Sequence, residues 1–215
     1  QAALLPDVLP MMADLNCNLV RVWGGGVYEP DAFFDWCDEN GVMVWQDFMT
    51  ACAVPPQDDD FAAFMKALNT VTVHLCRMIA GDGEGATKLL ECKVSGAGDL
   101  AMARTVAKSV VCSSLLKAAM FGADANWGRV LCAIGYSGAA VDVTKIGVSF
   151  RSAAGSVTVC QNGAGVPFSE EEAAKVLKEK EIEILVTLGL GEVSATAWGC
   201  DLTYDYVKIN GDYRT

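Results

Sequence analysis

Cysteine and histidine are the side chains in this sequence best suited to metal binding or nucleophilic chemistry. Nine cysteines occur at positions 17, 37, 52, 76, 92, 112, 132, 160 and 200. No two of them have CxxC spacing, and His74 is the single histidine, whereas a zinc site needs several such ligands in one cluster. We therefore predict no metal site. We expect reduced, mostly buried thiols, and His74 at a core or surface position of a helix.

Two glycine-rich segments could in principle cradle phosphate groups. They are "WGGG" at 23–26 and "GDGEGATK" at 81–88. Neither fits the dinucleotide motif GxGxxG or the phosphate-loop motif GxxxxGK[ST]. We therefore expect no nucleotide and no cofactor. Taken alone, "DGEG" is typical of a helix stop, and "NWGR" at 126–129 is typical of a helix cap.

Composition and charge restrict the classes of partner. Apolar residues make up 52% of the 215 residues and charged residues 20%, which indicates a folded core. The net charge of −11 argues against nucleic acid and anionic membranes as partners. The sequence contains no signal peptide and no apolar run of about 18 residues. We therefore expect a cytoplasmic protein.

The charge is unevenly distributed along the chain. Residues 1–60 contain 11 acidic residues and one basic residue, whereas residues 61–215 contain 16 acidic and 15 basic residues. The change falls near the acidic run at 58–60. Such a shift in composition indicates a domain boundary there.

The elements that would position any site alternate between helix and strand. At the front, a short helix at 6–15 precedes a buried strand at 17–23, a helix at 29–41 and a second buried strand at 42–48, which together predict a parallel strand–helix–strand unit. Further helices are predicted at 60–80, 99–111, 126–138 and 168–180, with caps at Asp99, Asn126 and Ser169. Strands are predicted at 88–96, 117–122, 146–150, 156–161, 181–189 and 192–200, with those at 146–150 and 156–161 forming an antiparallel pair. The pattern indicates an α/β fold.

The front of the chain resembles one enzyme family. The run "NLVRVWGGGVYEPDAFFDWCDENGVMVWQDFMTACAVPPQDDDF" is similar to the catalytic barrel of β-mannosidases in glycoside hydrolase family two. The resemblance implies early units of a (β/α)8 barrel, with Trp23 and Asp47 as sugar-subsite remnants at the carboxyl ends of two strands. The two catalytic glutamates of that family come from later strands, and the chain leaves the pattern before them. We expect no glycosidase activity, since the mechanism needs both carboxylates.

Residues 61–215 contain four motifs that point to a different family: "MIAGDGEGATKLLE", "FGADANWGRVLCAIGYSG", "GEVSATAWGCDLTYDYVKIN" and the terminal "GDYRT". With these motifs the segment resembles the carboxyl-terminal (β) chain of ornithine acetyltransferases, also called glutamate N-acetyltransferases, of arginine biosynthesis. The implied fold is the layered α/β arrangement of the acetyltransferase β chain. The implied activity moves an acetyl group from N-acetylornithine to glutamate through a threonine nucleophile.

The resemblance also implies partners and missing parts. In the family, the nucleophilic threonine follows a self-cleavage point, the oxyanion hole lies in that region and in an α chain, and the assembly is a heterotetramer. The sequence motifs of the family's cleavage region and oxyanion hole are not found here. The Met49–Thr50 pair only superficially matches the family's Ala-Thr-Met. The chain alone is therefore expected to be inactive.

The substrate contacts of the family map onto three residues of this chain. They are Glu84 in "DGEGATK", Asn210 in "VKIN" and Thr215 at the end of the sequence. A carboxylate can pair with the ammonium group of an amino acid, and an amide offers both donor and acceptor. We expect the tail to fold back to the loop around Glu84 as a short packed helical turn, with apolar contacts from Leu202, Tyr206 and Ile209.

These observations predict two domains of different origin. Residues 1–60 form a β-mannosidase-like βαβ fragment, and residues 61–215 form the acetyltransferase β-chain-like domain, with the seam between residues 55 and 64. Amino-acid acetyl transfer is the predicted function by lineage. A β-mannosidase fragment and a non-catalytic chimeric or fused reading frame, such as a binding or assembly module, stay open as alternatives.

Overall fold

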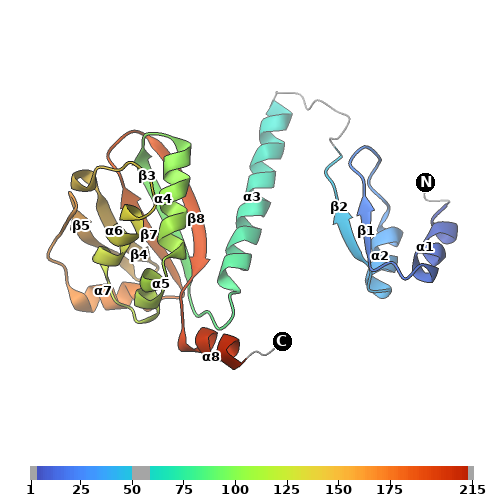
Figure 1. Cartoon of the computed structure of the whole chain (residues 1–215). Helices are drawn as coiled ribbons and strands as arrows, with labels where there is room; N and C mark the ends of the chain where they lie inside the picture. The colour runs from blue at the N-terminus through green and yellow to red at the C-terminus, as the bar shows by residue number, and fades with distance from the viewer. Residues whose placement is uncertain (1–3, 50–58, 213–215) are drawn as a thin grey trace. The chain divides into compact units, whose positions relative to one another are not determined.

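A computed structural model describes residues 4–49 and 59–212, which form two compact units (Figure 1). The units are residues 1–68 and 69–215, and they divide inside helix α3 (Asp59–Gly81). This division lies beyond the predicted seam. The different origins of residues 1–60 and 61–215 stay a prediction. No helix within the described ranges is long and apolar enough to cross a membrane.

The first unit is a small strand–helix–strand arrangement preceded by a helix. Its elements are α1 (Leu5–Asp14), β1 (Leu19–Val22), α2 (Asp31–Glu39) and β2 (Met43–Gln46). The strands β1 and β2 pair in parallel, with Leu19 opposite Met43. The predicted parallel βαβ unit is therefore confirmed.

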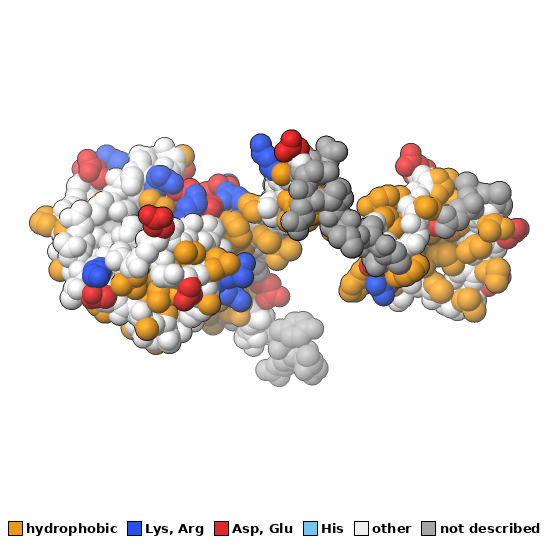
Figure 2. Space-filling model, turned by 90° about the horizontal axis from the view of Figure 1, so that it is seen from above, with side chains coloured by type: hydrophobic (Ala, Val, Ile, Leu, Met, Phe, Trp, Pro, Cys, Tyr) orange, Lys and Arg blue, Asp and Glu red, His pale blue; other side chains and the backbone are white. Residues whose placement is uncertain are grey.

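The core of the first unit is small. Its buried apolar residues are Leu9, Val22, Phe33, Cys37 and Val42. Large apolar side chains on both strands are exposed, among them Leu19, Met43 and Trp45, and Figure 2 shows apolar side chains over much of the visible surface of this unit. A two-stranded sheet with so little burial is marginally stable by itself.

The second unit is built on a six-stranded sheet in the order β6-β5-β4-β7-β3-β8. The neighbouring strands β7 and β3 pair in parallel, and the other pairs are antiparallel. The predicted antiparallel pairing of the strands near 146–150 and 156–161 is confirmed. The strands are β3 (Leu89–Ala97), β4 (Gly147–Ser152), β5 (Gly155–Gln161), β6 (Ala164–Gly165), β7 (Glu181–Thr187) and β8 (Val193–Cys200).

Helices pack on the apolar face of this sheet. Along β3, β4 and β7 alternate side chains are buried in one continuous core, as expected for strands with one face covered. Helix α4 lies against β3 and β8, helix α7 lies against β4 and β5, and α6 packs on α4 (Figure 1). The helices of this unit after α3 are α4 (Leu100–Cys112), α5 (Ser114–Phe121), α6 (Trp127–Gly135), α7 (Glu170–Leu177) and α8 (Tyr204–Asp212), with a 3₁₀ turn, η2, at Val143–Lys145.

Three predicted helix caps are confirmed. The side chain of Asp99 accepts a hydrogen bond from the Met102 amide at 2.7 Å. Asn126 caps α6 and Ser169 caps α7 in the same way, each through the amide three residues further on. Each cap satisfies a backbone donor that the first turn of a helix leaves free.

The strand predicted at 117–122 is wrong, because residues 117–121 belong to helix α5 and Gly122 is its C-cap. The Ser113 side chain accepts from the Leu116 amide at 3.4 Å and so caps the helix. The sequence that follows is rich in leucine, alanine and methionine, which favour helix strongly. The apolar content had indicated a buried strand, although it suits a buried helix equally well.

The thiols are less uniformly buried than the sequence indicated. Cys37, Cys92 and Cys160 are buried, but Cys76, Cys112 and Cys132 are exposed on helices, so the prediction is wrong for these three. A cysteine in an apolar run can still face solvent when the run forms an amphipathic helix. Cys52 lies outside the described residues. His74 occupies an exposed position on α3, as predicted.

Candidate functional site

A tight loop carries Glu84 between α3 and β3. The Ala86 amide donates to the Gly83 carbonyl at 2.9 Å and closes a turn around Glu84. Gly85 adopts a φ of +65°, and a Cβ there would lie 2.9 Å from both the Asp205 Cβ and the Tyr206 amide nitrogen. Glycine is therefore required for the backbone conformation and for the close approach of α8.

Asn210 on α8 contacts this loop directly. Its Nδ2 donates to Oε2 of Glu84 at 2.8 Å and to the Tyr206 carbonyl at 2.9 Å. The structure thus brings together two of the three residues predicted to contact substrate. The third, Thr215, lies outside the described residues, as does Thr50.

The Glu84–Asn210 pair leaves hydrogen-bond acceptors exposed. Both amide protons of Asn210 are used, so its Oδ1 is left as an acceptor. Within the described ranges, Oε1 of Glu84 has no protein donor, and both side chains are exposed. A pair with a negative charge and two available acceptors suits an ammonium group.

Helix α8 reaches the loop around Glu84 as predicted, and hydrogen bonds attach it there. The expected packing through Tyr206 and Ile209 is wrong. Tyr206 is 43% exposed and Ile209 is 45% exposed, and none of the described α8 residues is buried. Thr203 is 4% exposed. Its hydroxyl donates to the Gly85 carbonyl at 2.7 Å and accepts from the Tyr206 amide at 3.2 Å.

Asp201 holds the far end of the same loop. It is 3% exposed, and its Oδ1 accepts from the amides of Thr87 at 2.8 Å and Lys88 at 3.0 Å. Its Oδ2 accepts from the Thr87 hydroxyl. Neither Asp201 nor Thr203 was predicted from the sequence. For Thr203 the available signal was its place just before a helix with the acidic Asp205 in its first turn, which is typical of an N-cap.

Lys88 joins the loop to two helix ends. Its Nζ donates to the carbonyls of Met120 at 2.5 Å and Leu177 at 2.7 Å, which lie in the last turns of α5 and α7. A cation is favourable at such ends. Burial lowers the pKa of Lys88, and the nearby Asp201 carboxylate opposes that shift. The loop residues around Glu84 are thus fixed to the core.

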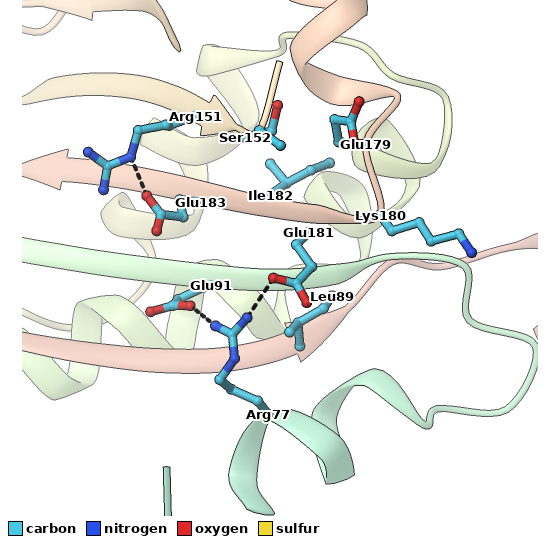
Figure 3. A pocket seen from close by; sticks show the side chains of 11 residues that line it. Arg77, Leu89, Glu91, Arg151, Ser152, Glu179, Lys180, Glu181, Ile182 and Glu183 are labelled. Carbon is cyan, nitrogen blue, oxygen red and sulfur yellow. Dashed lines mark hydrogen bonds and ion pairs between the residues drawn. The ribbon is translucent and has the colours of Figure 1, made fainter. Parts of the chain in front are cut away.

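A charged hollow of about 310 Å³ lies on the face of the sheet opposite α4 (Figure 3). Arg77 from α3 pairs with Glu91 and, at 2.7 Å, with Glu181. Glu183 pairs with Arg151 and Lys93. Burial raises the pKa of Glu183, but hydrogen bonds from its two cationic partners lower it overall. Because these charges neutralise one another, we assign this network to structure.

The two predicted sugar-subsite residues lie at the carboxyl ends of β1 and β2. Trp23 is 57% exposed. Asp47, however, pairs with Arg21 at 2.7 Å and accepts from the Gly24 amide at 3.2 Å. The hydrogen bond from Arg21 lowers the pKa of Asp47. Much of the carboxylate of Asp47 is thus already engaged, which leaves less of it for sugar hydroxyls.

No metal-binding arrangement of three or more His, Cys, Asp or Glu side chains occurs among residues 4–49 and 59–212. The Glu84–Asn210 pair is therefore described by its hydrogen-bond chemistry alone.

The chain is similar to members of one family over most of its length. The model of the ArgJ family matches residues 32–215. The arginine biosynthesis bifunctional protein ArgJ 1 of Clostridium acetobutylicum is 52% identical over 162 residues, which are 75% of this chain and 40% of that protein. The glutamate N-acetyltransferase of Methanopyrus kandleri is 46% identical over 158 residues, which are 74% and 41% of the two chains.

A solved structure shares the fold. The crystal structure of the arginine biosynthesis bifunctional protein argJ from Bacillus halodurans matches with a TM-score of 0.72 and 37% identity. The match covers 99% of this chain and 94% of that one. The predicted layered α/β fold class is confirmed. The chain spans less than half the length of the Clostridium and Methanopyrus relatives.

These comparisons do not support a separate origin for residues 1–60. The family match begins at residue 32, inside the segment that resembles β-mannosidases. The ArgJ protein of Symbiobacterium thermophilum aligns with all 215 residues at 52% identity, over 50% of its own length. The resemblance of the front segment to glycoside hydrolases stays a prediction.

Proposed function

The chain belongs to the ArgJ family, and on that premise we propose that it is the substrate-binding part of an enzyme that transfers acetyl groups between amino acids in arginine biosynthesis. The resemblance predicted for residues 61–215 is confirmed at the level of the family. The proposed donor is N-acetylornithine and the proposed acceptor is glutamate. The names of the relatives, which include a glutamate N-acetyltransferase, support this assignment.

The observation that carries the proposal is the 2.8 Å hydrogen bond between Asn210 and Glu84. The amino-acid chemistry of the substrates matches the two acceptors that this pair exposes. In the proposed complex, Oε1 of Glu84 accepts from the ammonium group of ornithine, and Oδ1 of Asn210 accepts a second proton from the same group. Thr215 is proposed as the third contact.

We further propose that the chemical step requires parts of the family protein outside the motifs found here. These are a threonine nucleophile and an α chain, which would assemble with this chain as a heterotetramer in the cytoplasm. The isolated chain is then expected to bind amino acids without transferring acetyl groups, and no cofactor enters the proposed step.

Titration calorimetry of the purified chain with L-ornithine tests the binding role. We expect binding in the wild type and at least about tenfold weaker binding in Glu84→Gln, because the substitution removes the charge that attracts the ammonium group. Glu192→Gln is the matched control, since Glu192 is an exposed carboxylate outside this site. Equal affinity for the wild type and Glu84→Gln, or no binding by the wild type, would contradict the proposal.

Residues 1–60 carry a second, separate hypothesis, a non-catalytic remnant of a β-mannosidase barrel. The parallel pairing of β1 and β2, with Trp23 and Asp47 at their carboxyl ends, is the observation that favours it. Quenching of tryptophan fluorescence by methyl β-mannoside tests this hypothesis. Quenching that disappears in Trp23→Ala but not in Trp198→Phe would support it, and no quenching would end it.

A further inference from the structure

We propose that Asp201 and Thr203 are positioning residues that bring Glu84 and Asn210 into one site, an inference that rests on the proposed function for its ligand. Within the described residues, the hydrogen bonds of both side chains go to Gly85, Thr87, Lys88 and Tyr206, and none goes to the side chain of Glu84 or Asn210. Asp201 and Thr203 are each buried, and each bonds to the loop that carries Glu84. Their role is to fix the distance between the loop that carries Glu84 and helix α8, which carries Asn210.

Asp201 fixes the loop relative to the sheet. Cys200 pairs with Leu89 at the ends of β8 and β3, and the Asp201 amide donates to the Lys88 carbonyl at 3.2 Å. The Asp201 carboxylate then accepts from the amides of Thr87 and Lys88. The backbone beyond the strand therefore continues to pair with the loop. A buried carboxylate with such donors is costly to disturb.

Thr203 fixes the tail relative to the loop. Its single hydroxyl donates to Gly85, the residue after Glu84, and accepts from Tyr206 in the first turn of α8. The same oxygen atom thus caps the helix that carries Asn210 and holds the turn that carries Glu84. The start of α8 cannot shift away from the turn without breaking one of these bonds.

The Thr203 contact matters because α8 has little apolar packing. No described side chain of α8 is buried; the Tyr204 ring meets Phe121 of α5 edge to face at 5.5 Å, but Tyr204 is 83% exposed. A nine-residue helix is marginal when its packing contributes little. Asn210 lies near the end of α8, about two helical turns from Thr203, so small rotations at the cap are amplified at the Asn210 amide. The cap therefore determines whether the two acceptors face one ligand.

Hydrogen exchange of the full chain, followed by mass spectrometry, tests without any ligand whether the Thr203 hydroxyl restrains α8. Thr203→Val keeps the shape of the side chain and removes the hydroxyl, whereas Thr203→Ser retains the hydroxyl. We expect exchange of the amides in residues 204–212 to become at least about tenfold faster in Thr203→Val and to return to within about threefold of the wild type in Thr203→Ser. Wild-type exchange in Thr203→Val would overturn the proposal.

Titration with L-ornithine tests the positioning role itself. We expect about tenfold weaker binding in Thr203→Val and recovery in Thr203→Ser, although neither variant changes a group that contacts the ligand. Faster exchange of α8 with unchanged affinity for ornithine would show that the hydrogen bonds of Thr203 are not needed for the site and would overturn the proposal. If the wild type binds no ornithine, the proposed function fails, and the exchange comparison still decides whether Thr203 fixes α8.

Asp201→Asn gives an independent check at the other end of the loop. Asparagine keeps one carbonyl oxygen as an acceptor and loses the charge and the second acceptor. We expect faster exchange in residues 82–88 with little change in the strands of the sheet. Exchange in residues 82–88 that matches the wild type would contradict the role of Asp201.

Discussion

Asn210 and Glu84 are 126 positions apart in sequence, yet Nδ2 of Asn210 lies 2.8 Å from Oε2 of Glu84. The contact depends on the return of the chain along β8 beside β3 and on the cap at the start of α8. The exposed acceptors of this pair are the basis for assigning an amino-acid ligand to the site.

Gly85, in the loop before β3, should be far less tolerant of substitution than Gly211 in α8. In Gly85→Ala, the new Cβ would meet Asp205 and Tyr206 at a backbone φ of +65°. We expect a loss of about 1–2 kcal/mol in the free energy of docking α8, measured as faster hydrogen exchange in residues 204–212.

Gly211→Ala is the matched control for that variant. A Cβ at Gly211 meets no atom within 4 Å, and alanine favours helix over glycine by up to about 1 kcal/mol. We expect unchanged or slower exchange in the same residues. Equal effects of the two alanine substitutions would show that the close approach at Gly85 does not restrain α8.

The cysteines should fall into two classes of reactivity toward iodoacetamide. Burial raises the pKa of the Cys92 thiol, and burial also raises the pKa values of Cys37 and Cys160. Since the thiolate is the reacting form, these three should stay unmodified in the folded chain near pH 8. The exposed thiols of Cys76 and Cys112 should react.

Peptide mapping by mass spectrometry before and after addition of urea checks the order of modification. The three buried cysteines should react only in urea. Modification of Cys92 at the rate of Cys112 in the folded chain would contradict the described core.

Lys88→Met should destabilise the second unit by about 1–3 kcal/mol near neutral pH, because carbonyls at the ends of α5 and α7 lose their donor. Urea unfolding followed by circular dichroism measures this change. The exposed Lys108 on α4 is the matched control, and Lys108→Met should stay within about 0.5 kcal/mol of the wild type.

The pH dependence of the Lys88 effect has a definite sign. Burial lowers the pKa of Lys88 below 10.5 in the folded chain, so the unfolded chain binds this proton more tightly. The contribution of Lys88 to stability should therefore increase as the pH rises through the window below 10.5. If the difference in free energy of unfolding between the wild type and Lys88→Met becomes smaller as the pH rises through that window, the result would contradict the burial of the amine.

The sequence predicted those features that depend on local patterns. The βαβ unit and the caps at Asp99, Asn126 and Ser169 follow from periodicity and from short-range hydrogen bonds. Helix α5 was mistaken for a strand, because a short apolar run has no clear period. The two-residue strand β6 and the turn η2 are too short to leave a pattern.

The site was predictable only in part. The resemblance gave Glu84 and Asn210, but the tail was expected to pack through Tyr206 and Ile209, which are exposed. The contacts that do fix it, from Asp201 and Thr203, join residues more than a hundred positions apart. Such pairs depend on the sheet topology, which local sequence patterns do not specify.

Removal of residues 1–57 should leave the fold of the second unit intact. That unit has its own continuous core, whereas the first unit exposes large apolar side chains on two short strands. We expect equal or better solubility. The near-ultraviolet circular dichroism contributed by the remaining aromatic residues should be unchanged. Loss of cooperative unfolding in the shortened chain would show that the front segment completes the core.

The most direct test of the central claim follows Asn210 itself by nuclear magnetic resonance. In ¹⁵N-labelled full chain, the side-chain amide signals of Asn210 and the backbone amide of Glu84 should shift together as L-ornithine is added, with one common saturation curve. The shifts should disappear in Glu84→Gln and persist in Glu192→Gln. If ornithine shifts other residues while both of these signals stay fixed, the amino-acid site does not lie at Glu84 and Asn210.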